Sequence, residues 1–205
     1  MLPITDIITL SKSLSLTTER LTVRLFRATD LECELKQQQD PEVVRYIRKP
    51  LSNEQAVESF EAMLKPWQGK ERQWLGLCVT RTADQQALGT ISFRFEVLDF
   101  AITEIGYRFC PEYQGHGYAF EAVTALVEFL FTTLKVHKII AICDPRNTAS
   151  FKLMQKLGME QEGLQRKHYK IGEQYSDALL AGLLAEDWAK MSTTTTTSAL
   201  ISAPV

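Results

Sequence analysis

Short runs in which apolar and polar residues alternate recur along this 205-residue chain. The clearest is RLTVRLFR, where Leu21, Val23 and Leu25 repeat at period two, and this repeat predicts a half-buried strand. The three runs between 73 and 109 are joined by short polar segments, so they predict an antiparallel meander. We predict strands at residues 20–27, 73–81, 87–98, 101–109 and 138–143, and two final strands that meet at Ile171 and Gly172.

Apolar residues at helical spacing separate several of these strands. Between Tyr118 and Leu134 they recur every three or four positions, which predicts an amphipathic helix. Ser52 and Gln55 form a capping-box pattern at the start of another. Further helices are predicted after a cap at Thr29 or Asp30, at 42–48 after Asp40-Pro41, and in DPRNTASFKLMQKLG with Gly158 at its C-cap. The pattern predicts an α+β protein with a mixed, mostly antiparallel sheet of about seven strands flanked by helices.

Both ends differ in composition from the middle. Residues 1–17 are rich in Ser, Thr and Leu without clear periodicity, and residues 192–205 are uncharged and low in complexity. We therefore divide the chain into an N-terminal arm (1–17), a central domain (18–190) and a C-terminal tail (191–205). Nothing in the tail gives it a reason to pack, which favours disorder or contact with a partner.

Charge and cysteine usage narrow the class of protein. The net charge of −2, with basic residues spread along the chain, argues against a dedicated nucleic-acid surface. The four cysteines form no CxxC pair and no metal-like spacing with the three histidines, so we expect free thiols and no metal. The first segment is a poor signal peptide, and no apolar run approaches the ~18 residues of a membrane span. We expect a cytoplasmic protein without membrane or nucleic-acid partners.

The stretch CPEYQGHGYAFEA, residues 110–122, places two glycines between a predicted strand and a predicted helix. Gly115 and Gly117 let the backbone approach an anion, and the first turn of a helix offers unpaired N–H groups with a partial positive charge. Two common phosphate motifs do not fit: GxxxxGK[ST] is missing, and the third glycine of GxGxxG would be Phe120. A different anion cradle is expected.

Gln114, Gly117 and Ala119 form Gln-x-x-Gly-x-Ala, which resembles the (Arg/Gln)-x-x-Gly-x-(Gly/Ala) motif of the GNAT superfamily of N-acetyltransferases. In that family the loop holds the pyrophosphate of coenzyme A. The stretches LTTERLTVRLFRATD, EIGYRFCPEYQGHGYAFEA and NTASFKLMQKLGMEQEG resemble its RimJ/RimL-type branch. The resemblance covers about residues 17–190 and implies the GNAT fold, in which two parallel strands, here 101–109 and 138–143, splay apart at an acetyl-CoA site.

The resemblance also implies which residues hold acetyl-CoA. Backbone groups of the first splayed strand would bond the pantetheine amides, and the amides of the glycine loop would hold the pyrophosphate. The helix after the second splayed strand would add a contact from its N-cap. The implied cofactor residues are Tyr107, Arg108, Phe109, Gln114, Gly115, His116, Gly117, Tyr118, Ala119, Asn147 and Phe151.

Two residues are implied as catalytic. Glu104 stands two residues before Gly106, where this branch often carries a carboxylate that faces the acceptor pocket and serves as a base. The alternative is a solvent-facing glutamate on a half-exposed strand. Ser150 lies on the helix where many family members use a tyrosine to protonate the departing thiolate. Its alternative is a serine that only caps the helix N-terminus.

The function implied is an N-acetyltransferase that moves an acetyl group from acetyl-CoA to a primary amine by direct attack in a ternary complex. The acceptor is a protein N-terminus, such as that of a ribosomal protein, or a small amine. By resemblance its pocket comes from segments 29–68 and 165–178, where Trp67 and Trp74 either line it or pack. A non-catalytic acyl-CoA-binding module is the alternative function, and a nucleotide-binding protein is a third. Homodimers are common for such folds.

Overall fold

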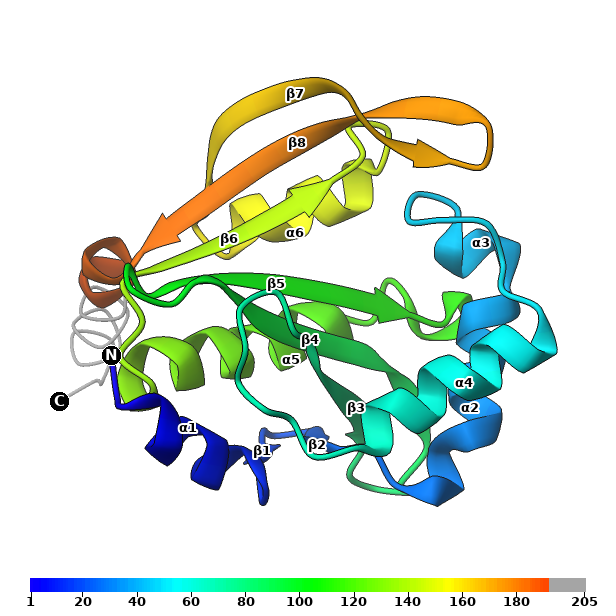
Figure 1. Ribbon diagram of the computed structural model, residues 1–205, viewed down its shortest axis with the longest axis horizontal. Coiled ribbons are helices and arrows are strands. Elements are labelled where there is room, and N and C mark those ends of the chain that lie inside the picture. Colours follow the sequence, from blue (N-terminus) through cyan, green and yellow to red (C-terminus); the bar gives the residue numbers. More distant parts are fainter. Residues whose placement is uncertain (192–205) are drawn as a thin grey trace, which may run out of the picture.

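The computed structural model describes residues 1–191, which fold around one sheet (Figure 1). Within these residues the sheet has eight strands in the order β1-β2-β3-β4-β5-β6-β8-β7. The strands are β1 (Ser15–Thr17), β2 (Leu21–Leu25), β3 (Leu75–Arg81), β4 (Ala87–Val97), β5 (Ile102–Phe109), β6 (Lys138–Cys143), β7 (Glu160–Ile171) and β8 (Gln174–Leu184). The α-helices are α1 (Ile4–Ser11), α2 (Leu31–Gln39), α3 (Pro41–Val44), α4 (Asn53–Leu64), α5 (Tyr118–Glu128) and α6 (Thr148–Lys156), and residues 185–191 are also helical.

One pair of strands breaks the antiparallel pattern of the sheet. All neighbouring strands among the described residues are antiparallel except β5 and β6. These two pair in parallel only from Ile102, opposite Lys138, to Glu104, opposite Ile140. Beyond Glu104 they diverge, while β6 keeps β8 as its antiparallel partner (Figure 1). The predicted fold class is confirmed, including the two splayed parallel strands.

The first 17 residues pack against the rest of the domain. β1 pairs with β2. It was not predicted, and it makes the sheet one of eight strands where about seven were expected. Ile7 of α1 and Leu14 are buried in the main hydrophobic core. Leu2, Ile4, Ile8 and Leu16 pack against the same core, so this segment is part of the folded domain. Of the predicted tail, 191–205, all but Met191 lies outside the described residues.

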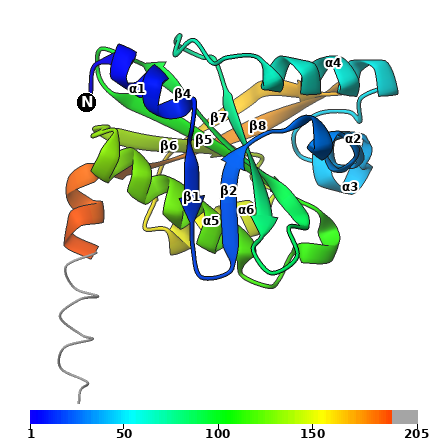
Figure 2. The same ribbon diagram turned by 90° about the horizontal axis from the view of Figure 1, so that it is seen from below.

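The sheet buries a different set of side chains on each face. Leu77 and Val79 of β3 lie in the main core, which also contains the buried side of α5. Cys78, between them, joins a second cluster with Phe26 and Phe60, and Phe60 belongs to α4. Because successive side chains of a strand point to opposite faces, α5 covers one face and α4 the other. Figure 2 shows these helices on the two sides of β2 and β3.

Two of the predicted helix starts are confirmed. The Ser52 hydroxyl accepts from the backbone N–H of Gln55 at 3.3 Å, and the Gln55 side chain accepts from the Ser52 N–H at 3.0 Å. The carboxylate of Asp40 caps α3 by accepting from the N–H groups of its first turn. Predicted for 42–48, this helix ends earlier, at Val44. Such caps depend on neighbours in sequence, so a local pattern is enough to find them.

Two other local predictions need correction. Neither Thr29 nor Asp30 caps α2 through its side chain, because the Asp30 carboxylate is taken by Arg24 in two hydrogen bonds of 2.7 and 2.9 Å. The helix predicted to run from Tyr118 to Leu134 is an α-helix only to Glu128 and continues as a π-helix over Phe129–Thr133. Among residues 1–191 there is no helix with the length and apolarity that a membrane crossing requires.

Candidate functional site

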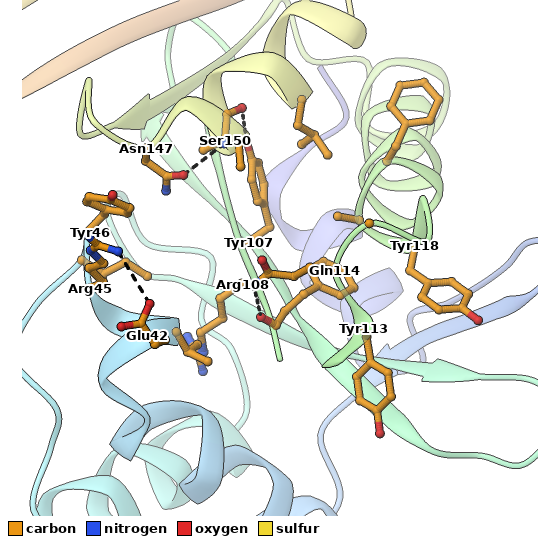
Figure 3. A pocket seen from close by; sticks show the side chains of 18 of the residues that line it. Glu42, Arg45, Tyr46, Tyr107, Arg108, Tyr113, Gln114, Tyr118, Asn147 and Ser150 are labelled. Atoms are coloured by element: carbon orange, nitrogen blue, oxygen red, sulfur yellow. Dashed lines mark hydrogen bonds and ion pairs between the residues drawn. The ribbon is translucent and has the colours of Figure 1, made fainter. Parts of the chain in front are cut away.

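A cavity of about 460 Å³ opens where β5 and β6 diverge. Its walls come from the end of β5, the glycine loop, the first turn of α6 and the α3 segment (Figure 3). The structure brings most of the predicted cofactor residues together here: Tyr107, Arg108, Phe109, Gln114, Gly115, Gly117, Tyr118, Ala119 and Asn147 line the cavity, together with Ser150. His116 and Phe151 do not line it: His116 is exposed on the loop, and Phe151 packs against the main core. What each residue does there stays a prediction.

The glycine loop is held in a shape that only glycine adopts easily. Gly115 and Gly117 have φ angles of 77° and 80°, in the left-handed region. Gln114 fixes the start of the loop, since its side-chain amide donates to the carbonyl oxygen of Phe109 at 3.1 Å. The helix α5 begins directly afterwards at Tyr118, so the N–H groups of its first turn have no acceptors within the helix. The loop therefore has the geometry of an anion cradle.

Arg20 and Glu121 anchor the loop to the start of β2, a contact that the sequence did not indicate. Arg20 donates to the carbonyl oxygen of His116 at 3.1 Å and forms an ion pair with Glu121 at 2.6 Å. Its guanidinium also lies over the ring of Tyr118, 4.7 Å from the centroid. Burial tends to raise the pKa of Glu121, but hydrogen bonds from Thr18 and Arg20 outweigh it and hold that pKa below its usual value. The Glu121 carboxylate is therefore ionised at neutral pH.

Ser150 lies in the first turn of α6, and its hydroxyl faces Tyr107. The two hydroxyl oxygens are 3.0 Å apart, and the Tyr107 hydroxyl also lies 3.2 Å from the Ser150 carbonyl oxygen. The helix cap is Asn147, whose side-chain oxygen accepts from the Ser150 N–H at 3.1 Å. The hydroxyl of Ser150 is therefore not the cap of α6, and its role as a proton donor stays a prediction. Burial raises the pKa of Tyr107, so this hydroxyl keeps its proton at neutral pH.

Glu104 sits at the point where the parallel pairing of β5 and β6 ends. Glu104 does not line the cavity. It is only 8% exposed, so the alternative interpretation, a solvent-facing glutamate, is wrong. Arg94, directly opposite on β4, donates two hydrogen bonds to one of its carboxylate oxygens. Burial raises the pKa of Glu104 above the usual glutamate value, although Arg94 opposes this shift. A buried carboxylate with a raised pKa is suited to accept a proton, and the catalytic role itself stays a prediction.

Arg108 contacts a buried carboxylate that the sequence did not indicate. Its guanidinium forms an ion pair with Glu34 of α2, which is fully buried. Glu34 also accepts from Gln38 at 2.8 Å and from the hydroxyl of Thr90 at 2.9 Å. The sequence indicated only a backbone role for Arg108, since nothing local connects it with a helix 74 residues earlier. The guanidinium of Arg108, a residue that lines the cavity, is thus held in place by Glu34.

The two tryptophans proposed for the acceptor pocket have different environments. Trp67 is buried in the core beside Phe93 and Phe95, so it packs. Trp74 is 40% exposed, and Arg94 lies over its ring at 4.7 Å from the centroid. Only Trp74 is therefore available at the surface near Glu104.

Of the two segments expected around the acceptor, residues 29–68 contribute to the lining of the cavity and residues 165–178 do not. The α3 segment contributes Glu42, Arg45 and Tyr46 to its lining (Figure 3). The turn between β7 and β8 comes close to the same region, because a Cβ on Gly172 would lie 2.5 Å from the Lys49 side chain. No group of His, Cys, Asp and Glu residues that could hold a metal occurs among residues 1–191.

Comparisons with known proteins agree on one family. A family profile described as "Acetyltransferase (GNAT) domain" matches residues 20–160. The uncharacterized N-acetyltransferase YnaD of Bacillus subtilis (strain 168) is 31% identical over 173 residues, which are 84% of this chain and 98% of that protein. The [Ribosomal protein uS5]-alanine N-acetyltransferase of Escherichia coli (strain K12) is 32% identical over 106 residues, 51% of this chain and 55% of that protein. A crystal structure of a GNAT-family acetyltransferase from Bacillus anthracis superposes with a TM-score of 0.75 at 29% identity, covering 84% of this chain and 99% of that one.

Proposed function

Because the chain belongs to the GNAT acetyltransferases, we propose that it moves an acetyl group from acetyl-CoA to a primary amine by direct attack within a ternary complex. Its family and relatives show an acetyl-CoA-dependent acyltransferase. The observation that supports this proposal best is the cavity at the splay of β5 and β6. It joins the glycine loop, the Tyr107–Ser150 pair and the α3 segment in one continuous space.

At one end of this cavity, the glycine loop would take the pyrophosphate of acetyl-CoA. Backbone N–H groups at a helix N-terminus favour phosphate through both hydrogen bonding and the helix dipole. The unpaired edges of β5 and β6 beyond Glu104 leave backbone groups free for the pantetheine amides. A backbone N–H on β5 would also stabilise negative charge on the thioester oxygen during attack.

The loop geometry gives a first prediction. In Gly117→Ala a φ of 80° costs the alanine about 1–2 kcal/mol, so the free loop relaxes to another conformation and must return to this one when acetyl-CoA binds. We expect the Kd for acetyl-CoA, measured by isothermal titration, to rise by about tenfold. Gly163→Ala is the matched control, because a Cβ there meets no atom within 4 Å and the residue has no positive φ. An unchanged Kd in Gly117→Ala would show that this loop does not hold the cofactor.

In the proposed reaction the acceptor must lose a proton and the departing thiolate must gain one. Glu104 would take the proton from the attacking amine, directly or through water. An α-amine has a pKa near 7.7–8.0, so about a tenth to a fifth of it is already neutral at pH 7 and a weak base is sufficient. A lysine-type amine, with a pKa near 10.4, needs far more assistance. This chemistry favours an α-amine.

Ser150 would donate its hydroxyl proton toward the sulfur of coenzyme A, and solvent would restore it. Since a thiol has a pKa near 8.5, its thiolate is a moderate leaving group, and we expect Ser150→Ala to lower kcat by only about tenfold. The KM for acetyl-CoA should change little. Ser92→Ala is the control: its hydroxyl contacts the Gly106 carbonyl oxygen at 3.4 Å, and it does not line the cavity. Equal kcat values for the wild type and Ser150→Ala would remove Ser150 from the mechanism.

For the acceptor we propose a protein N-terminus, such as that of a ribosomal protein, in keeping with the RimJ/RimL-type resemblance. The similarity to an enzyme named for the alanine of ribosomal protein uS5 supports this choice, although it spans half of the chain. A small amine is the second candidate. The cytoplasm as location, a homodimer as assembly and the lack of nucleic-acid and membrane partners are our expectations for the same enzyme.

An acceptor screen by release of free thiol tests the proposal. It compares peptides with a free N-terminal alanine or serine, the same peptides with a blocked N-terminus, free amino acids and polyamines. Thiol release with the free peptides alone supports an N-terminal acetyltransferase. Release with the small amines alone would instead identify a small amine as the acceptor. Binding of acetyl-CoA without thiol release from any of them would instead identify a non-catalytic acyl-CoA-binding module.

A further inference from the structure

Arg94 and Glu104 occupy directly opposed positions on β4 and β5. Opposed residues of an antiparallel pair place their side chains on the same face of the sheet, so this contact is built into the register. The Glu104 side chain is 10% exposed and that of Arg94 is 24% exposed. The pair therefore lies largely out of water at the end of the β5–β6 pairing.

Both hydrogen bonds of the pair end on the same oxygen. Nε of Arg94 donates to Oε2 of Glu104 at 2.9 Å, and Nη2 donates to the same atom at 2.5 Å. Among the described residues, nothing donates a hydrogen bond to the other oxygen, Oε1. One half of the carboxylate is thus fixed, while the other half keeps its lone pairs available.

Arg94 is itself held from two further directions. The ring of Trp74 lies against its guanidinium, with 4.7 Å between the centroid and the central carbon. Glu96, on the same strand, lies 3.2 Å from Nη2 and is bound in turn by Arg72 at 2.9 Å. A guanidinium with these contacts has little freedom to turn, and its planar fork restricts the carboxylate more than a lysine ammonium would.

We propose that Arg94 is a positioning residue for the transfer reaction: it fixes Oε2 of Glu104 and thereby presents Oε1 as the proton acceptor for the attacking amine. This role rests on the proposed function. Arg94 also lowers the cost of ionising a carboxylate that lies so far out of water, since a buried charge without a partner is strongly disfavoured. Arg94 does not touch the reacting atoms and acts only through Glu104.

The charged groups around Glu104 determine the sign of the pH effect. They are Arg94 and Glu96 on β4 and Arg72 in the segment before β3, and the facing residue of β6 is the apolar Ile140. Burial and Glu96 raise the pKa of Glu104, whereas Arg94 and Arg72 lower it. Without Arg94 this pKa rises further. A base must be unprotonated, so the acid limb of kcat, measured at saturating acceptor, should move to higher pH.

The test uses Arg94→Gln, Arg94→Lys and Glu104→Gln in the full chain, with thiol release as the readout. We expect Arg94→Gln to lower kcat at pH 7 by about tenfold or more and to shift the acid limb upward, with a partial recovery in Arg94→Lys, which keeps the charge but not the fork. In the Glu104→Gln background, Arg94→Gln should change kcat by less than about twofold, because the residue through which it acts is gone. Arg72 contacts Glu96 and not Glu104, so Arg72→Gln should move the acid limb of kcat to higher pH by a much smaller amount.

Two results would overturn the proposal. One is an Arg94→Gln enzyme with the kcat and acid limb of the wild type; if its Tm is lower, the contact of Arg94 with Glu104 serves stability alone. The other is an effect of Arg94→Gln on kcat that has the same size with and without Glu104. A wild-type enzyme that releases no thiol with any acceptor is a different failure: it refutes the proposed function, and the role of Arg94 falls with it.

Discussion

We expect Glu104→Gln to lower kcat/KM by about 10²- to 10⁴-fold, the range typical for loss of a general base. The amide is the same size as the carboxylate and still accepts a hydrogen bond from Arg94, but it cannot take a proton from the amine. The acid limb of kcat that belongs to Glu104 should disappear. Because burial raises the pKa of Glu104, that limb in the wild type should lie above the value of about 4.3 for an exposed glutamate.

Glu162→Gln is the matched control for this experiment. Glu162 is also a strand glutamate in an ion pair, 2.6 Å from Lys138, but it lies on β7, which pairs with β8, and not at the point where β5 and β6 diverge. Its kcat/KM should equal that of the wild type. If Glu104→Gln loses less than about threefold in kcat/KM, below about 0.7 kcal/mol, Glu104 is not the base.

The largest expected effect on stability comes from Glu34. Glu34→Gln removes the negative charge that compensates the largely buried guanidinium of Arg108, whose side chain is 17% exposed. Breaking one side of a buried ion pair leaves an uncompensated charge, and we expect the free energy of unfolding to fall by about 3 kcal/mol. Urea denaturation measures this as a lower midpoint at an unchanged m-value.

Two further variants isolate the cause of that loss. Glu32→Gln makes the same chemical change at an exposed position on α2 and should leave the midpoint unchanged. Adding Arg108→Met to Glu34→Gln removes the orphaned charge and should restore part of the stability, as replacing both members of a buried pair often does. A Glu34→Gln protein as stable as the Glu32→Gln control would mean that the pair contributes nothing to the fold.

Features that depend on neighbours in sequence were predictable. The capping box of Ser52 and Gln55 and the cap at Asp40 are completed within three residues, so their patterns carry the whole interaction. The strand runs and the Gln-x-x-Gly-x-Ala loop were predictable for the same reason, since each is defined by a few consecutive residues. The exception is Asp30, whose carboxylate bonds Arg24 at the end of β2 instead of capping α2, because the strand and the helix start are packed together.

By itself, the sequence determined the order of strands and helices between residues 20 and 184, the glycine loop and the chemical type of the groups near it, because each depends on a few adjacent residues; it did not indicate α1 or β1. Only the tertiary structure decided how these groups are held. Glu121 meets Arg20 across 101 positions, and Glu34 meets Arg108 across 74. Arg94 faces Glu104 because of the β4–β5 register. The pKa of a carboxylate depends on its burial and its charged partners, and both come into being only when distant segments pack.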